Sequence, residues 1–151
     1  MDLQKKTNRY NRIYLQIEEL LKKSHDDLAH MATINAVLYH KMDYFFWCGF
    51  YRLVEGTLIV GPYQGPVACQ ILEKNKGVCW SSINQQKTII VPDVHLFPGH
   101  IACDSRSQSE IVIPYFDKNG KIKGVLDIDS KEKNSFDEID AAYLEKIISL
   151  I

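Results

Sequence analysis

The chain has 151 residues, which is enough for one domain with a substantial core and too few for two domains of ordinary size. Its net charge of −1 gives no bulk electrostatic attraction to nucleic acid or to an anionic membrane. No apolar run approaches the roughly 20 residues of a membrane span, and residues 1–6 lack the apolar centre of a signal peptide. We therefore expect a cytoplasmic protein whose thiols are kept reduced.

Two helices are predicted at the start of the chain, between Tyr10 and about residue 42. The first runs from Tyr10 to about Lys23, where apolar residues recur at helical spacing with charged residues between them. Ser24 is the predicted N-cap of the second helix, because the acidic residues that follow it suit the positive end of a helix dipole. We expect both helices to cover a sheet or to join a dimer interface.

Strands are predicted for most of the chain between Tyr44 and Ser130, where the texture becomes aromatic and β-branched. The Asn119-Gly120 pair between two apolar runs predicts a tight hairpin. Ser135 and Glu138 have capping-box spacing, which predicts a last helix over about 136–151. The predicted strands cover residues 45–54, 57–60, 67–72, 88–91, 111–116 and 122–128, with a short helix over 78–85 and a strand end in the stretch 61–66.

The order helix, helix, several strands, helix predicts an α+β domain with a mostly antiparallel sheet and helices packed on it. We expect residues 1–151 to form a single domain. No internal repeat and no low-complexity linker divides the sequence.

The long loop between residues 91 and 111 is the densest in reactive side chains, and ordered loops of this kind often carry function. It holds His95, His100 and Cys103, and at this point Cys103 could be a buried thiol, a metal ligand or a nucleophile. Cys69 and Cys79 also lie beside turns, and a reactive thiol beside a second thiol is the arrangement for sulfenic acid formation and disulfide resolution. The cysteine spacing matches no Cys-x-x-Cys pair or zinc-finger pattern.

Acidic residues form a second unusual pattern. Asp127 and Asp129 share one face of a predicted strand, although strands are depleted in Asp. They lie either at a solvated strand end or at a site for a cation, which could be a metal or an ammonium group. The hairpin brings Glu110 beside them, and mutual repulsion would raise some of the three pKa values.

Two other pairs of residues have alternative interpretations. Trp47 and Tyr51 face the same side of their strand, either as core packing or as an aromatic wall for an apolar ligand group. His95 and His100 either fix the loop by hydrogen bonds or act as ligands or acid–base groups.

Six short motifs occur in order along the chain, namely Gly61-Pro62-Tyr63-Gln64-Gly65 with Ala68-Cys69, Gly77-Val78-Cys79, Asp93-Val94-His95, Gly99-His100-Ile101-Ala102-Cys103-Asp104, Ser109-Glu110-Ile111-Val112 and Gly124-Val125-Leu126-Asp127-Ile128-Asp129-Ser130. Together they closely resemble the free methionine-R-sulfoxide reductases, which are enzymes built on a GAF domain. The resemblance runs from about Trp47 to the C-terminus. It implies a six-stranded antiparallel sheet with helices on one face and a loop-enclosed site on the other.

The resemblance also implies an activity. It implies reduction of free methionine-R-sulfoxide by thiol chemistry, with no metal or organic cofactor and with an external dithiol such as thioredoxin, maintained by NADPH, as reductant. Cys103 is then the nucleophile, Cys69 the main resolving thiol and Cys79 an auxiliary one. Cys48 matches no family cysteine and is interpreted as structural. The resemblance suggests a homodimer, to which the N-terminal helices contribute.

The remaining site residues follow from the same resemblance. It implies that Glu110, Asp127 and Asp129 bind the substrate and that Trp47 and Tyr51 hold its methyl sulfoxide end. Among the carboxylates, Glu110 is our first choice as general acid.

Two other functions are compatible with parts of the sequence. A non-catalytic GAF module that senses small molecules or redox state would need no set of cysteines, and we expect it to be joined to an output domain. A metal-dependent hydrolase would use His95, His100 and the carboxylates.

Overall fold

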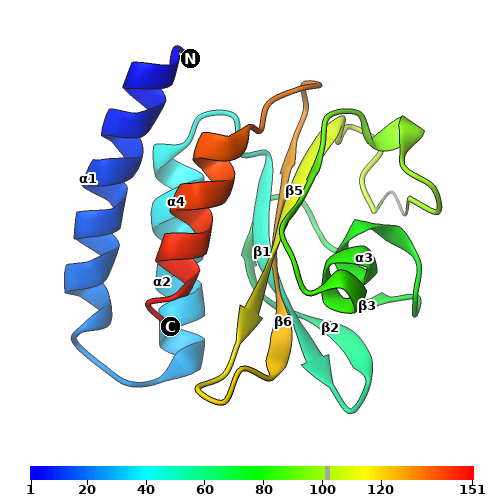
Figure 1. The fold of residues 1–151 in the computed structure, drawn as a ribbon, viewed down its shortest axis with the longest axis horizontal. Coiled ribbons are helices and arrows are strands. Elements are labelled where there is room, and N and C mark those ends of the chain that lie inside the picture. The colour runs from blue at the N-terminus through cyan, green and yellow to red at the C-terminus, as the bar shows by residue number, and fades with distance from the viewer. Residues whose placement is uncertain (101–102) are drawn as a thin grey trace.

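Within residues 1–100 and 103–151, which the computed structural model describes, six strands form one antiparallel sheet in the order β3-β2-β1-β6-β5-β4 (Figure 1). The predicted α+β fold with an antiparallel sheet is confirmed. No helix of these residues is both long enough and apolar enough to cross a membrane. The strands are β1 Trp47–Val54, β2 Thr57–Gln64, β3 Ile71–Leu72, β4 Ile89–Val91, β5 Ser109–Phe116 and β6 Ile122–Ser130.

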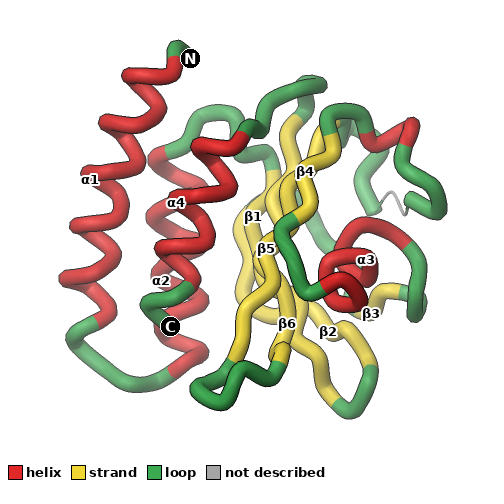
Figure 2. Tube along the Cα trace, viewed as in Figure 1, coloured by secondary structure: helices red, strands yellow, loops and turns green. Residues whose placement is uncertain are grey.

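The helices divide between the two faces of the sheet. Three of them lie on one face: α1 Leu3–Leu21, α2 Asp27–Lys41 and α4 Glu138–Ile148. Figure 1 shows α1 as the outermost of the three, packed against α2 and α4. The short helix α3, Gly77–Gln85, lies with the long loops on the opposite face (Figure 2). The face away from the three long helices is thus the one that loops enclose.

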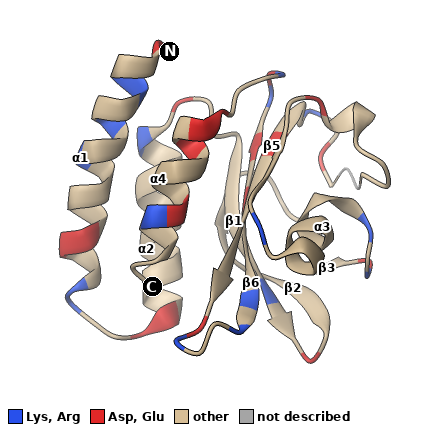
Figure 3. Ribbon diagram, in the orientation of Figure 1, with Lys and Arg blue, Asp and Glu red and all other residues tan. Residues whose placement is uncertain are grey.

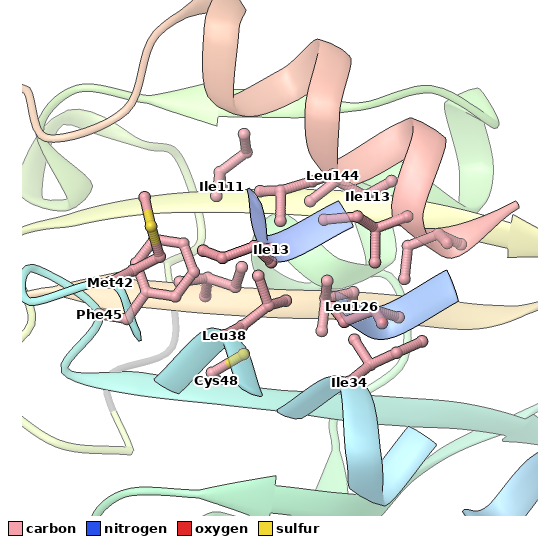
Figure 4. Packing of buried hydrophobic residues seen from close by; sticks show 14 of the residues in the cluster. Ile13, Ile34, Leu38, Met42, Phe45, Cys48, Ile111, Ile113, Leu126 and Leu144 are labelled. Atoms are coloured by element: carbon pink, nitrogen blue, oxygen red, sulfur yellow. The ribbon is translucent and has the colours of Figure 1, made fainter. Parts of the chain in front are cut away.

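The main core fills the space between the three helices and the sheet. Alternate residues of the central strands point into it, so Ile111, Ile113, Leu126 and Ile128 meet the apolar sides of the helices. Figure 4 shows this packing, with Cys48 among the apolar side chains. The same alternation turns every second residue of β5 and β6 toward the loop-enclosed face.

Both predicted N-caps are wrong by two residues. Asp26 caps α2 by accepting a hydrogen bond from the Ala29 N–H at 3.0 Å, while the Ser24 hydroxyl accepts one from Asp26 itself. The last helix is capped by Asp137, with Asp140 closing the capping box in place of Ser135 and Glu138.

Tertiary contacts explain the position of the last helix. The Asp140 carboxylate is fully buried and accepts hydrogen bonds from Lys6 at 2.7 Å and from Tyr10 at 2.6 Å. Both donors lie on α1, so the start of α4 is fixed by a partner more than a hundred residues away. The first helix also begins earlier than predicted, since Asp2 caps it by accepting from the Lys5 N–H.

The strand boundaries differ most from the prediction in two places. Only Ile71–Leu72 of the predicted strand over 67–72 form a strand. The second strand does not end at residue 61 but continues through Gln64, because Tyr63 and Gln64 still pair with β1 beyond a register shift. Gly65 then turns the chain with φ near +122°, a conformation that residues other than glycine rarely adopt. The predicted hairpin is confirmed: Asn119 and Gly120 lie in the turn that joins β5 to β6.

Candidate active site

A pocket lies on the loop-enclosed face of the sheet and contains about 630 Å³ of space, part of it open to solvent. Its walls come from β1, β5, β6, the first turn of α3 and the loops that follow β2 and β4. They combine aromatic rings, cysteine sulfurs and carboxylates: Trp47, Tyr51, Cys79, Cys103, Glu110, Asp127 and Asp129. The structure therefore brings every site residue that the resemblance implies, except Cys69, directly into the pocket lining.

The three carboxylates meet because of the strand register. Glu110 pairs with Asp129 across β5 and β6, and Asp127 is two residues from Asp129 on the same face. Glu110 and Asp127 are each only 6% exposed, and their carboxyl groups share a hydrogen bond. In Figure 3 the red of Asp and Glu residues lies within the sheet, beside the β5 label. The carboxylates thus lie in a buried site and not at a solvated strand end.

Burial controls the charge of this cluster. It raises the pKa of Glu110 well above the ordinary value, and the negative charges of Asp127 and Asp129 raise this pKa further. Burial also raises the pKa of Asp127, but hydrogen bonds from Glu110 and Cys79 oppose that rise. These directions favour a protonated Glu110 that donates to Asp127, and burial also raises the pKa of Asp129 well above its ordinary value. The other oxygen of Asp127, Oδ1, is buried and has no hydrogen-bond partner in the described residues.

Aromatic rings form the wall beside the carboxylates, since Trp47 pairs with Asp129 across β1 and β6. Trp47 stacks on Tyr51 with ring centres 5.9 Å apart. The Trp47 indole donates a hydrogen bond to the Pro66 carbonyl at 3.0 Å, and the Tyr51 hydroxyl donates to the Cys69 carbonyl at 2.8 Å. The wall therefore also fixes the segment that carries Cys69.

The four cysteines occupy three different environments. Cys69 and Cys103 form a disulfide with their Cα atoms 5.6 Å apart, which joins the loop after β2 to the loop after β4. Cys79 is a free, buried thiol in the first turn of α3 and donates a hydrogen bond to Asp127; burial raises its pKa. Cys48 lies in the core on the other face, where its thiol donates to the Asn35 side chain at 3.5 Å.

The two loop histidines are separated in space. His100 lines the pocket, and its Nε2 lies 3.8 Å from a Glu110 oxygen. Burial lowers the pKa of His100, which favours the neutral imidazole. His95 is exposed and contacts the Gln108 side chain at 3.3 Å, away from the pocket lining. The structure therefore does not assemble the metal site that the hydrolase hypothesis needs from both histidines. The loop residues 101 and 102 lie outside the described residues.

Sequence reasoning missed the rim of the pocket. The Arg106 guanidinium donates two hydrogen bonds to the Asp104 carboxylate, at 2.7 and 3.0 Å. These bonds lower the pKa of Asp104 to about 2. The same guanidinium lies 4.9 Å from the centre of the Phe46 ring, and Phe46 and Ser107 also line the pocket. The acid–base spacing of Asp104 and Arg106 in the sequence could have indicated a fixed loop, but nothing local indicates the contact with Phe46.

These features define a GAF domain with a thiol-containing pocket. The GAF domain family model matches residues 27–151. The free methionine-R-sulfoxide reductase of Escherichia coli is 38% identical, with 95% of this chain and 87% of that protein aligned.

Solved structures agree with this relationship. The free methionine-R-sulfoxide reductase of Neisseria meningitidis in complex with its substrate has a TM-score of 0.92 and 38% identity, covering 99% of this chain and 88% of that chain. The Staphylococcus aureus reductase with its substrate has a TM-score of 0.87 and 40% identity, covering 93% and 92%. The chain belongs to the family of GAF-domain free methionine-R-sulfoxide reductases.

Proposed function

We propose that this protein reduces free methionine-R-sulfoxide to methionine by cysteine chemistry, as a single GAF domain over residues 1–151. One observation carries the proposal: a single pocket joins the loop of Cys103, an aromatic wall and three carboxyl groups, among which burial raises the pKa of Glu110. A sulfoxide needs a soft nucleophile for its sulfur and a proton for its oxygen. The pocket lining offers both, from Cys103 and Glu110.

Cys103 carries out the first step in this proposal. Its thiolate attacks the sulfoxide sulfur, and Glu110 gives its proton to the sulfoxide oxygen. The oxygen is transferred to the Cys103 sulfur, which becomes a sulfenic acid while methionine leaves. The thiol thereby loses the two electrons that the substrate gains. The aromatic wall of Trp47 and Tyr51 holds the methyl sulfoxide end during this step.

Cys69 carries out the second step. Its thiol condenses with the sulfenic acid, releases water and leaves the Cys69–Cys103 disulfide, the covalent state of the structure. An external dithiol such as thioredoxin, kept reduced by NADPH, then exchanges with this disulfide. No metal or organic cofactor is required in this cycle, with Cys79 held in reserve as an auxiliary thiol. A reducing cytoplasm is the location that suits such recycling.

The carboxylates account for selection of the free amino acid. Asp127 and Asp129 bind the substrate ammonium group, and the unpartnered Oδ1 of Asp127 gains its missing hydrogen bond. A methionine inside a peptide has no ammonium group at this position, and its chain would collide with the walls.

We also propose that the protein works as a homodimer. The support is the family resemblance together with the apolar side chains Leu3 and Leu15, which α1 leaves exposed. Sedimentation of the reduced protein measures its mass, and a concentration-independent monomer would reject this part of the proposal.

A stoichiometric test needs no added reductant. Fully reduced protein mixed with free methionine-R-sulfoxide should release one methionine per chain and lose two of its four thiols, leaving Cys48 and Cys79 free. Methionine is measured by chromatography and thiols by a chromogenic disulfide reagent under denaturing conditions. Loss of thiols without methionine, or no reaction at all, would reject the proposed function in favour of a sensor.

Asp127→Asn and Asp129→Asn should each weaken substrate binding while the fold is kept. A charge-assisted hydrogen bond contributes roughly 1.5–3 kcal/mol, so KM should rise about 10- to 150-fold. The matched control is Asp43→Asn, which changes a carboxylate that is 77% exposed. Unchanged kinetics in both pocket variants would remove the carboxylates from substrate recognition.

Cys69→Ser should separate the chemistry from the recycling. The first step needs only Cys103, so about one equivalent of methionine should still form in a single turnover. Steady-state activity with a thioredoxin-type protein should fail, whereas small dithiothreitol should reduce the sulfenic acid directly and keep part of the activity.

The double variant with Cys79→Ser tests whether Cys79 replaces Cys69. For Cys69→Ser itself, loss of the single-turnover yield while Cys103 still reacts with a thiol probe would place Cys69 in the chemical step. That result would contradict its resolving role.

A further inference from the structure

The pocket lining holds three buried groups that can bind a metal ion. The Cys79 sulfur, a Glu110 oxygen and an Asp127 oxygen all lie within 4.8 Å of one another, and all three residues are buried. They come from α3, β5 and β6, so packing of the helix on the sheet creates the group.

The spacing of these atoms is close to that of a metal site. Zinc binds thiolate sulfur at about 2.3 Å and carboxylate oxygen at about 2.1 Å, which places the ligand atoms of a tetrahedral site roughly 3.5 Å apart. Side-chain rotations can close the remaining gap because the ligand atoms stand at the ends of the side chains. His100, whose Nε2 lies 3.8 Å from a Glu110 oxygen, is a neighbouring nitrogen donor outside this group of three residues.

Among the residues that the structure describes, no Lys or Arg pairs with this group. Asp127 lines the pocket, its buried Oδ1 accepts no hydrogen bond from these residues, and Asp129 adds a third carboxylate beside it. Burying such an oxygen costs free energy unless a cation or a hydrogen-bond donor contacts it. The thiol makes the choice of cation specific, because sulfur favours zinc over the hard ions magnesium and calcium.

We infer that Cys79, Glu110 and Asp127 form a binding site for Zn²⁺, and that zinc and substrate exclude each other. Binding forms zinc–sulfur and zinc–oxygen bonds and releases the Cys79 thiol proton and the Glu110 carboxyl proton to solvent, with no change in oxidation state. The exclusion rests on the proposed function, because the zinc ligands Asp127 and Glu110 are also the proposed substrate ligands. Because the proposed catalysis needs no metal, bound zinc should inhibit the enzyme.

The oxidised protein provides a clean test, because its Cys69–Cys103 disulfide leaves only Cys48 and Cys79 as thiols. Zinc binding is measured by competition with a chromogenic chelator, and Co²⁺ replaces zinc for absorption spectra. We expect one ion per chain and a thiolate-to-cobalt charge-transfer band in the near ultraviolet. Cys79→Ser should remove the band and weaken zinc binding roughly tenfold or more. Asp127→Asn should weaken zinc binding to a similar extent.

Cys48→Ala is the matched control, since Cys48 is a buried thiol on the opposite face of the sheet. It should leave both the zinc affinity and the cobalt band unchanged. A wild-type protein without the band would overturn the site even if the Cys79 variant failed to fold. Zinc binding that survives both Cys79→Ser and Asp127→Asn would overturn it as well.

Competition with the substrate completes the test. Cys103 is blocked in the disulfide, so free methionine-R-sulfoxide can bind without turnover, and it should displace the zinc. Zinc that stays bound at saturating sulfoxide would overturn the exclusion. Failure of zinc binding in an active enzyme rejects this inference alone, whereas zinc binding in a protein that reduces no sulfoxide rejects the proposed function alone.

Discussion

Cys103→Ser is expected to abolish turnover with every reductant. A serine hydroxyl is not ionised near neutral pH and is a hard nucleophile, so it cannot replace a thiolate at the sulfoxide sulfur. The variant should still bind substrate, because the carboxylates and the aromatic wall are unchanged. Methionine release in single-turnover and steady-state assays measures the effect.

The control for this variant is Cys48→Ala, which removes a thiol from the core on the other face and should keep the activity. Retention of even about a tenth of the wild-type rate by Cys103→Ser would remove Cys103 from the role of nucleophile.

Glu110→Gln is expected to lower the turnover number by about 10²- to 10⁴-fold, the range for loss of a general acid. Glutamine keeps the shape and can donate a hydrogen bond to Asp127, but it cannot deliver a proton to the sulfoxide oxygen. KM should change less than the turnover number. Glu55→Gln, which alters an exposed carboxylate outside the pocket lining, is the matched control.

The pH profile distinguishes an acid from a merely structural glutamate. Burial raises the pKa of Glu110, so the protonated form is present at low pH, and wild-type activity should fall as pH rises through that raised pKa. Glu110→Gln should lose this alkaline decline. A variant with the wild-type decline would show that another group supplies the proton.

The same carboxyl links stability to pH. Because its pKa is raised in the folded state, its stabilising contribution is complete below the ordinary carboxyl pKa of about 4.3 and is lost as pH rises through the folded value. The thermal midpoint of Glu110→Gln should therefore decline less between acidic and alkaline pH than that of the wild type.

The carboxylate cluster was predictable from local sequence. Period-two alternation puts Asp127 and Asp129 on one face, and the Asn119-Gly120 turn sets the register that brings Glu110 opposite Asp129. Register and face are local properties of a hairpin, which explains why this part of the candidate site could be derived from the sequence.

Contacts between distant segments were not predictable. Ser24 and Asp26 are both good caps two residues apart, and the choice at α4 depends on the burial of Asp140 against Lys6 on α1. The hydrogen bond of Cys79 to Asp127 depends on how α3 packs on the sheet. No periodicity or cap in the sequence encodes that packing, so the position of Cys79 beside the carboxylates required the structure.

The most direct test of the central claim compares three substrates with the reduced enzyme and dithiothreitol: free methionine-R-sulfoxide, its S epimer and a peptide that contains methionine-R-sulfoxide. Turnover of the free R epimer alone is predicted, because the ammonium must reach Asp127 and Asp129 while the sulfoxide oxygen faces Glu110. Equal turnover of the peptide, or of the S epimer, would contradict an ammonium-selective closed pocket. No turnover of any of the three would contradict the reductase activity itself.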